Sequence, residues 1–397
     1  MMQPKAAQTQ QTFDVVVIGA GSMGSATAYH LAKDGRRVLL LEQFTVGHTR
    51  GSSHGGSRII RYTHETISDA SIMPATFALW RALEKESGQA LLQMTGGLYM
   101  TAETDPWLHD TRKTLQALNF PYRELSPAEM RHEYPQFRLP DNMVTLYQAE
   151  SGILAATRCV QTLAAQTVRH GAELREQTKV LAVTPTADGV AVRLATHGGE
   201  EVVYAQQAIL TAGPWAKGFL DQLVAYPLPL QVTHQQVAYF AVEQPELYAV
   251  GRFPLFMYNV EPYLYGFPIF EKPGYVKIAL ELLDLVVDPD QPGVIDPIYL
   301  RQLLEIVNQT MVGLKPDALH IETCRYTETP NRDFIIDRHP AHPQILIGAG
   351  FSGRGFKFAI SVGRLLADLA GSAPGAYNSP FWLPKFAISR FAKPVSP

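Results

Sequence analysis

The sequence predicts an α/β fold in which a discontinuous, Rossmann-type nucleotide-binding domain carries an inserted domain built on an antiparallel sheet. Residues 15–18 form a β-branched run that leads into a glycine-rich turn at residues 19–24 and then into a helical pattern. The same order of apolar strand, glycine turn and helix recurs near the C-terminus, over residues 345–369. Between these two units, residues 227–242 alternate well enough between apolar and polar side chains to predict a long strand.

The first glycine turn reads GAGSMG, and each of its glycines has a physical reason. Gly19 permits the tight turn, and Gly21 lets backbone N–H groups approach a pyrophosphate. Gly24 allows the following helix to pack closely on the strand, and the N-terminus of that helix attracts an anion. The turn therefore predicts a nucleotide site.

A second apolar run, residues 38–41, ends in Glu42, which lies 23 residues after Gly19. An acid at this place suits a hydrogen bond to a ribose hydroxyl. It argues for an adenosine ribose without a 2′-phosphate, so the cofactor is FAD or NAD. The motif does not choose between these two.

Composition narrows the classes of function. At 397 residues the chain exceeds most single cores, which favours two domains. A net charge of −3 gives no argument for nucleic acid or a membrane surface, and no apolar run reaches the roughly 18 residues of a membrane helix. The two cysteines, Cys159 and Cys324, cannot build a disulfide framework, and the polar N-terminal segment lacks the apolar core of a signal peptide. A cytoplasmic protein without a metal site is therefore expected.

The local pattern predicts the remaining elements. Helices are expected over residues 74–87, 155–170 and 297–312, the first with Phe77, Leu79, Trp80 and Leu83 as candidate buried positions. Strands are expected over residues 180–183, 190–194 and 202–204 as a small meander, and over 207–211, 263–267 and 275–280. Residues 49–61 are rich in Gly, Ser and Arg, with too little apolar content for a core element, and predict a loop near the cofactor.

Five motifs occur in order along the chain: GAGSMG (19–24), GSSHGGSRIIR (51–61), YGFP (265–268), CRYTETPNRDFIID (324–337) and GFSGRGFKF (350–358). Together they resemble the monomeric sarcosine oxidase / N-methyltryptophan oxidase family of flavoproteins, over nearly the whole chain. The resemblance implies FAD attached covalently, through the flavin 8α-methyl, to the sulfur of Cys324. It also implies a monomer that oxidises a secondary (N-methyl or cyclic) amino acid to an imine while molecular oxygen is reduced to hydrogen peroxide.

The resemblance also implies how the chain is divided. The FAD-binding domain is expected to comprise residues 12–85, 151–218 and 326–375. The substrate domain is expected to comprise residues 86–150 and 219–325.

Four cations receive roles from the resemblance. Arg58 matches an arginine that lies over the flavin ring, and Arg61 and Lys357 match residues on the substrate carboxylate. Lys277 matches the lysine that faces the flavin where oxygen is reduced, because a fixed cation in a dry site stabilises superoxide. A planar guanidinium at Arg61 suits bidentate contact with a carboxylate.

Two further sets of residues follow from the same resemblance. Tyr265 and Tyr326 are expected to line the substrate pocket as catalytic-site aromatics. The expected cofactor contacts are Gly19, Gly21, Ser22, Met23, Gly24, Glu42, Ser57, Arg58, Val180, Gly213, Trp215, Cys324, Gly353, Gly355 and Lys357.

Without the resemblance, several of these residues have plainer interpretations. Lys277, inside the apolar run GYVKIAL, would face water from a half-exposed strand. Cys324 would be a small buried residue, although its neighbours Glu322, Arg325 and Tyr326 are not apolar and a thiolate near cationic groups would be reactive. Lys357, which stands between two phenylalanines, would be a surface lysine with a buried stem.

Arg58 and Arg61 have a similar alternative as two surface arginines. They are three residues apart, so a strand would send them to opposite faces, whereas a turn or coil can present both to one ligand. The sequence alone leaves both geometries open.

Two positions depart from the family pattern. Glu281 stands four residues after Lys277, where the small-substrate members carry histidine, and Arg354 stands in the glycine turn where histidine is usual. The pocket gains an acid and a base if both side chains point inward, so the amine substituent is not fixed. A flavin dehydrogenase that uses another acceptor, and a flavin-binding protein without turnover, stay open as alternatives.

Overall fold

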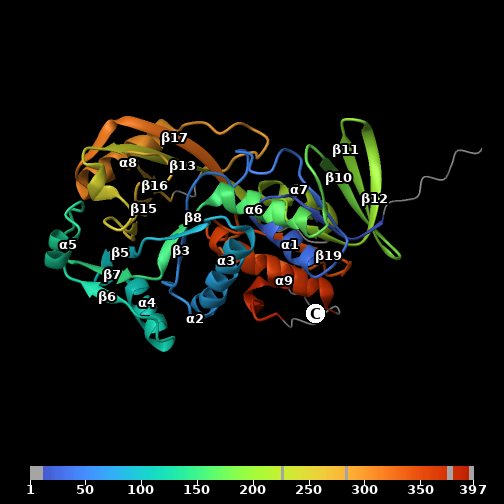
Figure 1. Cartoon of the computed structure of the whole chain (residues 1–397), viewed down its shortest axis with the longest axis horizontal. Helices are drawn as coiled ribbons and strands as arrows, with labels where there is room; N and C mark the ends of the chain where they lie inside the picture. Colours follow the sequence, from blue (N-terminus) through green and yellow to red (C-terminus); the bar gives the residue numbers. More distant parts are fainter. Residues whose placement is uncertain (1–11, 225–227, 282–284, 373–378, 393–397) are drawn as a thin grey trace, which may run out of the picture.

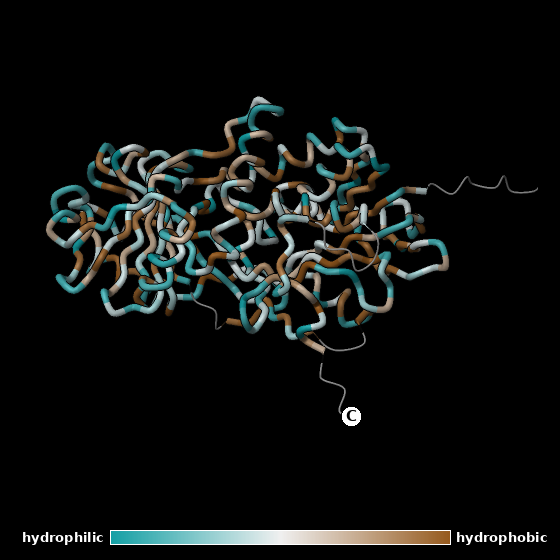
Figure 2. The backbone as a smooth tube through the Cα atoms, turned by 90° about the horizontal axis from the view of Figure 1, so that it is seen from below, coloured by the Kyte–Doolittle hydropathy of each residue, from teal (hydrophilic) through white to brown (hydrophobic). Residues whose placement is uncertain are grey.

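The computed structural model describes residues 12–224, 228–281, 285–372 and 379–392. Within these ranges the strands form two large sheets and one small sheet. Figure 1 shows the two large sheets toward opposite ends of the molecule, and Figure 2 shows apolar stretches through the interior of both halves. Pro227, the expected start of the long strand, and residues 1–11 of the polar N-terminal segment lie outside the described residues.

The first large sheet has a parallel core in the order β9-β2-β1-β12-β19. Residues 15–18 of β1 are buried, as expected for a β-branched strand between two layers. The strand β12 is central, because one of its edges pairs with β1 and the other with β19. Three strands extend this core in antiparallel fashion. The bounds are Thr12–Ile18 (β1), Val38–Leu41 (β2), Glu173–Arg175 (β9), Lys179–Thr186 (β10), Gly189–Thr196 (β11), Gly199–Leu210 (β12), Ile335–Arg338 (β18) and Ile345–Ala349 (β19).

The helices α1 (Ser22–Lys33), α6 (Ala156–Arg169) and α9 (Ala359–Gly371) lie against this sheet, and α3 (Met73–Ser87) packs on α9 and α6. Glycine permits the two closest approaches. A Cβ on Gly24 would lie 1.8 Å from the carbonyl oxygen of Gly19, and one on Gly363 would lie 2.5 Å from the backbone of Ala26. Since α1 and α9 each press a small residue against the neighbouring element, they can cover the sheet side by side.

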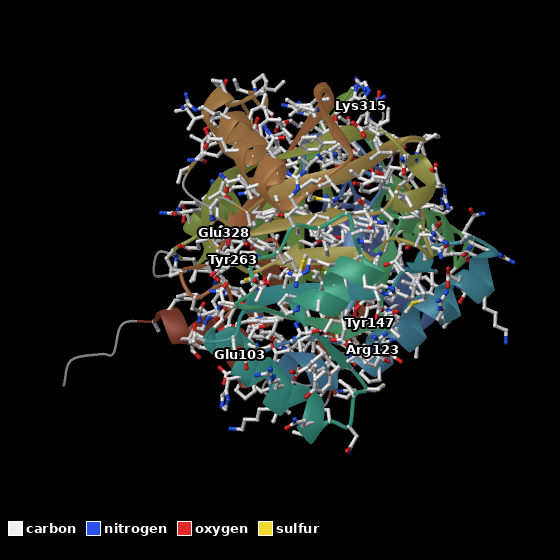
Figure 3. The ribbon with its side chains drawn as sticks, turned by 90° about the vertical axis from the view of Figure 1, so that its left-hand side faces the viewer. Glu103, Arg123, Tyr147, Tyr263, Lys315 and Glu328 are labelled. Carbon is white, nitrogen blue, oxygen red and sulfur yellow. The ribbon has the colours of Figure 1, made fainter. Side chains whose placement is uncertain are left out.

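The second large sheet runs in the order β17-β13-β16-β15-β14-β5-β7-β6. It is antiparallel except for the pair β14 and β5, which corrects the expectation of a purely antiparallel sheet. In Figure 3, Lys315 and Glu328 mark the two ends of β17, and Arg123 and Tyr147 mark the paired strands β6 and β7. The bounds are Gly97–Ala102 (β5), Arg123–Leu125 (β6), Met143–Gln148 (β7), Gln231–Val242 (β13), Leu255–Tyr258 (β14), Leu264–Phe267 (β15), Tyr275–Leu280 (β16) and Leu314–Glu328 (β17).

The small sheet joins the two halves and corrects the prediction for residues 49–61. The end of that segment is not a loop but the strand β3 (Arg58–Arg61), which pairs with β8 (Ser151–Leu154). β8 also pairs with β4 (Leu92–Met94). Ile60 is fully buried, so this short apolar pair is enough to anchor a segment otherwise made of Gly, Ser and Arg.

Other expectations are refined by the structure. Residues 202–204 and 207–211 belong essentially to one strand, β12, because the chain passes from one partner strand to the next without a turn. The predicted boundary between residues 325 and 326 falls inside β17, so the domain limits remain a proposal. Leu79 is only half-buried, whereas Phe77, Trp80 and Leu83 are buried.

The remaining helices are short or peripheral. Their starts follow ordinary capping chemistry: Ser126 and Glu129 form a capping box, and Asp296 accepts from the backbone N–H of Ile298. The bounds are Ile67–Ser71 (α2), Pro106–Ala117 (α4), Pro127–Glu133 (α5), Ala216–Leu223 (α7) and Pro297–Thr310 (α8), with 3₁₀ turns at Gly213–Trp215, Pro245–Tyr248, Phe356–Phe358, Pro384–Phe386 and Ile388–Phe391.

Candidate active site

A cavity of about 500 Å³ lies at the carboxyl ends of the parallel strands. The loops that follow β1, β12 and β19 all line it, although these strands are far apart in sequence. Crevices outside the carboxyl ends of parallel strands are the usual ligand sites of such sheets. Of the expected cofactor contacts, those that line this cavity are Gly19, Gly21, Ser22, Met23, Glu42, Arg58, Val180, Gly213, Trp215, Gly353 and Gly355.

The first glycine turn fits a dinucleotide in this structure. Gly19 has φ +96°, and a Cβ there would lie 2.7 Å from the carbonyl oxygen of Thr211. Gly21 is the N-cap of α1, so the positive end of the helix faces the cavity and favours an anion, and the backbone N–H of Ser22 donates to Oγ of Ser53 at 3.1 Å. Gly24 does not line the cavity; its absent side chain serves the packing of α1.

Glu42 lies at the end of β2 with both carboxylate oxygens engaged. Its Oε2 accepts from the backbone N–H of Ala20 at 2.9 Å, and its Oε1 accepts from that of Phe44 at 2.9 Å. Burial raises the pKa of Glu42, and these N–H donors oppose the increase. The side chain is therefore held in place and can still accept from a ribose hydroxyl.

The rim of the cavity is tied to a loop from the second half of the chain. Trp215 donates its Nε1–H to Oδ1 of Asp290 at 2.7 Å, and Arg50 donates to the carbonyl oxygen of Asp290 at 3.4 Å. Arg325 donates to the carbonyl oxygens of Arg50 and Gln291. These contacts join the strand that carries Cys324 to the edge of the nucleotide cavity.

The register of the second sheet puts the candidate residues on one face. Tyr239 of β13 is paired with Lys277 of β16, and Cys324 of β17 is paired with Gln235 of β13. Alternate residues of a strand share a face, so Glu322, Cys324 and Tyr326 project together. This face is turned toward the cavity, which Tyr326 lines.

Cys324 is buried and does not itself line the large cavity. Burial raises the pKa of Cys324, although Arg58, Lys277 and Arg325 all favour its thiolate. Burial and the nearby cations thus act in opposite directions on the thiol, and the thioether expected at Cys324 stays a prediction. The desolvation cannot be read from the neighbouring residues alone.

Lys277 is buried rather than solvent-facing. Its Nζ lies 3.2 Å from Oε1 of Glu271 and 3.2 Å from Oγ of Ser57. Burial lowers the pKa of Lys277, and the Glu271 carboxylate offsets part of that effect. Ser57 does not line the large cavity; it holds this lysine.

Glu271 is the functional candidate that sequence reasoning missed. It accepts from the backbone N–H of Gly56 at 2.8 Å and from the Tyr239 hydroxyl at 2.6 Å, in addition to its ion pair with Lys277. In the sequence it sits in the turn FEKPG and resembles a surface charge. A lysine inside an apolar strand needs a partner when it is buried, and that requirement is the signal that could have led to Glu271.

Arg58 and Arg61 point to different cavities, as the strand geometry of β3 requires. Arg58 lines the large cavity and donates to the carbonyl oxygens of Ser52 and His54, at 2.9 and 2.8 Å. Arg61 lines a second cavity of about 30 Å³ together with Lys357 and lies over the ring of Tyr99. The two arginines therefore do not face one ligand side by side.

The small cavity is rich in cations. Lys357 is buried, and its Nζ donates to the carbonyl oxygen of Arg354 at 2.8 Å. Burial, then the charges of Arg61 and Arg354, lower the pKa of Lys357 well below its usual value. Within the described part of the chain, Nη1 of Arg61 has no hydrogen-bond partner. Three acids, Glu65, Asp69 and Asp333, also line this cavity, and they form ion pairs with Arg354 and Lys385. An anion beside Arg61 and Lys357 would supply a counter-charge to these two cations.

The two departures from the family pattern have different environments. Glu281 forms an ion pair with Arg332, which has φ +60° and lies beside Glu328. Arg354 lines the small cavity, and its Nη2 donates to the carbonyl oxygen of Arg332 at 2.8 Å. The added acid is therefore neutralised by its own arginine, and the added base faces the cation-rich cavity.

The two expected pocket tyrosines lie near each other. Tyr326 lines the large cavity, and the ring of Tyr326 fills the space beside Gly353. Burial raises the pKa of Tyr265, and its hydrogen bond with Tyr326 opposes that increase. Both phenols are therefore neutral at ordinary pH.

Metal sites and membrane-spanning helices were sought in the described ranges. These ranges contain no group of three or more His, Cys, Asp or Glu side chains arranged to hold a metal ion. No helix in them combines the length and apolarity needed to cross a bilayer.

Comparisons with known proteins agree with this geometry. A family model described as "FAD dependent oxidoreductase" matches residues 14–369. Peroxisomal sarcosine oxidase from Homo sapiens is 36% identical over 392 residues, which cover 97% of this chain and 98% of that protein. Monomeric sarcosine oxidase from Bacillus sp. (strain NS-129) is 33% identical over 90% of this chain and 92% of that protein. The solved open form of NikD, an unusual amino acid oxidase essential for nikkomycin biosynthesis, matches with a TM-score of 0.82 and 27% identity over 95% of this chain and 97% of that chain. The predicted α/β fold is confirmed.

The Lys277–Glu271 pair predicts how stability depends on pH. Because the pKa of Lys277 is lowered in the folded state, the unfolded state binds more protons between that pKa and the free-lysine value, and stability rises with pH in this window. Glu271→Gln removes the carboxylate that raises this pKa, so the rise should begin at lower pH. The variant should also lose about 3–5 kcal/mol near neutrality, because it leaves a buried charge unpaired. Denaturant unfolding of the holoprotein at several pH values measures both effects.

The double variant Glu271→Gln/Lys277→Met is the control. It should lose the added pH dependence, since the titrating amine is gone. Identical pH profiles for Glu271→Gln and the unsubstituted protein would show that the pair does not set the pKa of Lys277.

Proposed function

The chain belongs to the family of FAD dependent oxidoreductases, and from this premise we propose that it oxidises a secondary amino acid to an imine and passes the electrons to molecular oxygen, forming hydrogen peroxide. The sarcosine oxidases among its relatives support flavin-dependent amine oxidation. One observation carries the proposal: Cys324, Arg58 and Lys277 interact electrostatically beside a cavity at the ends of the parallel strands. The substrate is a small N-methyl or cyclic amino acid, and the protein acts as a monomer.

The cavity-lining residues fit FAD, as described for the glycine turn and Glu42. When bound, FAD supplies the acceptor for a hydride from the carbon next to the amine nitrogen. Arg61 and Lys357 bind the substrate carboxylate and so fix which C–H bond is presented. The amine must be unprotonated for its lone pair to form the C=N bond, so the rate rises with pH.

Lys277 supplies the positive charge on the oxygen side. A buried ammonium stabilises the negative charge that develops on oxygen during reduction, and it is pre-oriented by Glu271 and Ser57. Cys324 holds the flavin through a thioether. The nearby cations Arg58 and Lys277 support this role by favouring the thiolate against the cost of burial.

Cys324→Ala should abolish covalent attachment of the flavin, because Cys159, the other cysteine, is a buried residue of α6 whose charged neighbours are Glu84 and Arg158. The measurement is whether yellow colour stays with the protein after acid precipitation. Cys159→Ala is the matched control and should keep the colour. Retention of flavin by precipitated Cys324→Ala would rule out this thioether.

Lys277→Met should slow reoxidation of the reduced enzyme by oxygen far more than its anaerobic reduction by substrate. One well-placed electrostatic contact is worth about 2.7–4 kcal/mol of barrier, or on the order of 10²–10³ in rate. Stopped-flow absorbance separates the two half-reactions. Equal slowing of both, or turnover without peroxide, would favour a dehydrogenase that uses another acceptor.

Arg61→Ala should lower kcat/KM for amino-acid substrates, since it removes a charge-assisted contact worth roughly 1.5–3 kcal/mol. Part of the loss should appear in the rate of flavin reduction, because a misoriented substrate reacts more slowly. Arg61→Lys should not restore full activity, since an ammonium lacks the planar fork.

A matching amine without a carboxylate is the control substrate for Arg61. The unsubstituted enzyme should oxidise it poorly, and Arg61→Ala should change its kinetics little. Unchanged kinetics of Arg61→Ala toward the amino acid would leave Arg61 as a structural residue and direct attention to Arg354.

A further inference from the structure

A continuous series of polar contacts leads from Lys277 to the protein surface. Nζ of Lys277 lies 3.2 Å from Oε1 of Glu271, and Oε2 of Glu271 lies 2.6 Å from the Tyr239 hydroxyl. The same hydroxyl lies 3.1 Å from Oε2 of Glu322, whose Oε1 lies 2.9 Å from Nζ of Lys272. Every step is within hydrogen-bond distance or close to it.

Burial decreases along this series in one direction. The side chains of Lys277 and Glu271 are 5% and 10% exposed, whereas those of Glu322 and Lys272 are 34% and 37% exposed. Tyr239 is fully buried between the two carboxylates. The series therefore joins a buried ammonium to water through one phenol.

Tyr239 is suited to pass a proton rather than to hold a charge. Burial, then Glu271, raises the pKa of Tyr239, so the phenol stays neutral. One hydroxyl hydrogen faces two carboxylates, so the phenol can donate to Glu271 while it accepts a proton from Glu322, or the reverse.

Several neighbouring elements contribute charged and titratable groups around the series from Lys277 to Lys272. Arg58 and Cys324 face Lys277, and His54 lies within electrostatic reach of Lys277 and Glu322. His320 is paired with Tyr239 across β13 and β17. Lys272 and Lys277 both lie over the Tyr239 ring, at 4.5 and 5.6 Å from its centroid.

We propose that Glu322, Tyr239 and Glu271 form a proton relay that returns a proton from water to the buried amine of Lys277. The relay rests on the proposed oxidase function. Dioxygen takes two electrons and one proton from the anionic reduced cofactor, so hydrogen peroxide requires one further proton. Lys277 gives that proton to the peroxide anion and is left as the neutral amine. Glu322, protonated by solvent, gives a proton to the Tyr239 hydroxyl as that hydroxyl gives its own to the Glu271 carboxylate, and Glu271 passes this proton to the amine. One proton is consumed from solvent for each peroxide, and both acids return to carboxylates.

The test follows reoxidation of the photoreduced holoenzyme after mixing with oxygen, in H₂O and in D₂O, with a pH-indicator dye present. Flavin absorbance reports electron transfer, and the dye reports the proton taken from solvent. Tyr239→Phe and Glu322→Gln should slow proton uptake and reoxidation about tenfold or more and increase the solvent isotope effect. Reduction by substrate should stay unchanged. Imidazole buffer should restore much of the rate of Glu322→Gln, since a small acid can replace a missing surface relay group.

Matched controls exclude a general disturbance of the sheet. Tyr275→Phe changes a tyrosine of the same side-chain cluster that lies outside the series, and Glu246→Gln changes an exposed acid of the same half of the molecule. Both should behave like the unsubstituted enzyme. The unfolding curve and flavin spectrum of the Tyr239→Phe holoenzyme show whether this variant is folded. Glu322→Gln changes a half-exposed residue, so it tests the relay without disturbing the buried part of the sheet.

The outcomes separate the relay from the proposed function. Normal proton uptake and isotope effects in both relay variants would overturn the relay, even if Lys277→Met reoxidises slowly. Absence of peroxide in every variant would overturn the oxidase function. The dye would then follow proton exchange with an added quinone acceptor, and unchanged exchange in the relay variants would overturn the relay as well.

Discussion

The structure depends on the pairing of one strand, β12, with two others. Its two edges bring β1 and β19 together, although these strands lie more than three hundred residues apart in the chain. The loops that follow the three strands then meet at one end of the sheet and line the large cavity. The entire second sheet is built from segments that lie between β1 and β19 in the chain, so the chain must return to the first sheet after forming it. The site is thus a product of strand order rather than of any single segment.

Sequence reasoning succeeded where local pattern and burial agree. The β-branched residues of β1 and the glycines after it predict both the strand and the turn, because a buried parallel strand favours β-branched residues and a Cβ at Gly19 or Gly24 would clash with backbone. It failed where pairing partners decide the outcome. β3 looks like a loop until β8 is beside it, and the two expected pieces of β12 are one strand only because different partners take over along its length.

In the site, too, local motifs predict the backbone positions, whereas contacts between distant segments decide the environment of the side chains. Arg58, Tyr326 and most of the expected glycines line the cavity, since a motif fixes where its own backbone goes. The ionisation of Cys324 and the partner of Lys277 depend on desolvation and on a residue from a different turn. Lys277 and Lys357 look alike in sequence, yet one is paired with Glu271 and the other faces Arg61 and Arg354. The carboxylate of Glu271 offsets part of the cost of burying the first charge, whereas the cations Arg61 and Arg354 add to the cost of burying the second.

The bond between Gly56 and Glu271 also bears on how such enzymes can be recombined. Glu271 belongs to the turn between β15 and β16, but its carboxylate accepts from a backbone N–H of the segment before β3. A Cβ on Gly56 would lie 2.3 Å from the Glu271 side chain, so the glycine and the acid are matched in shape as well as in hydrogen bonding. A chimera that joins this substrate sheet to another flavin module must transfer both residues, or the lysine they position will be left without its support.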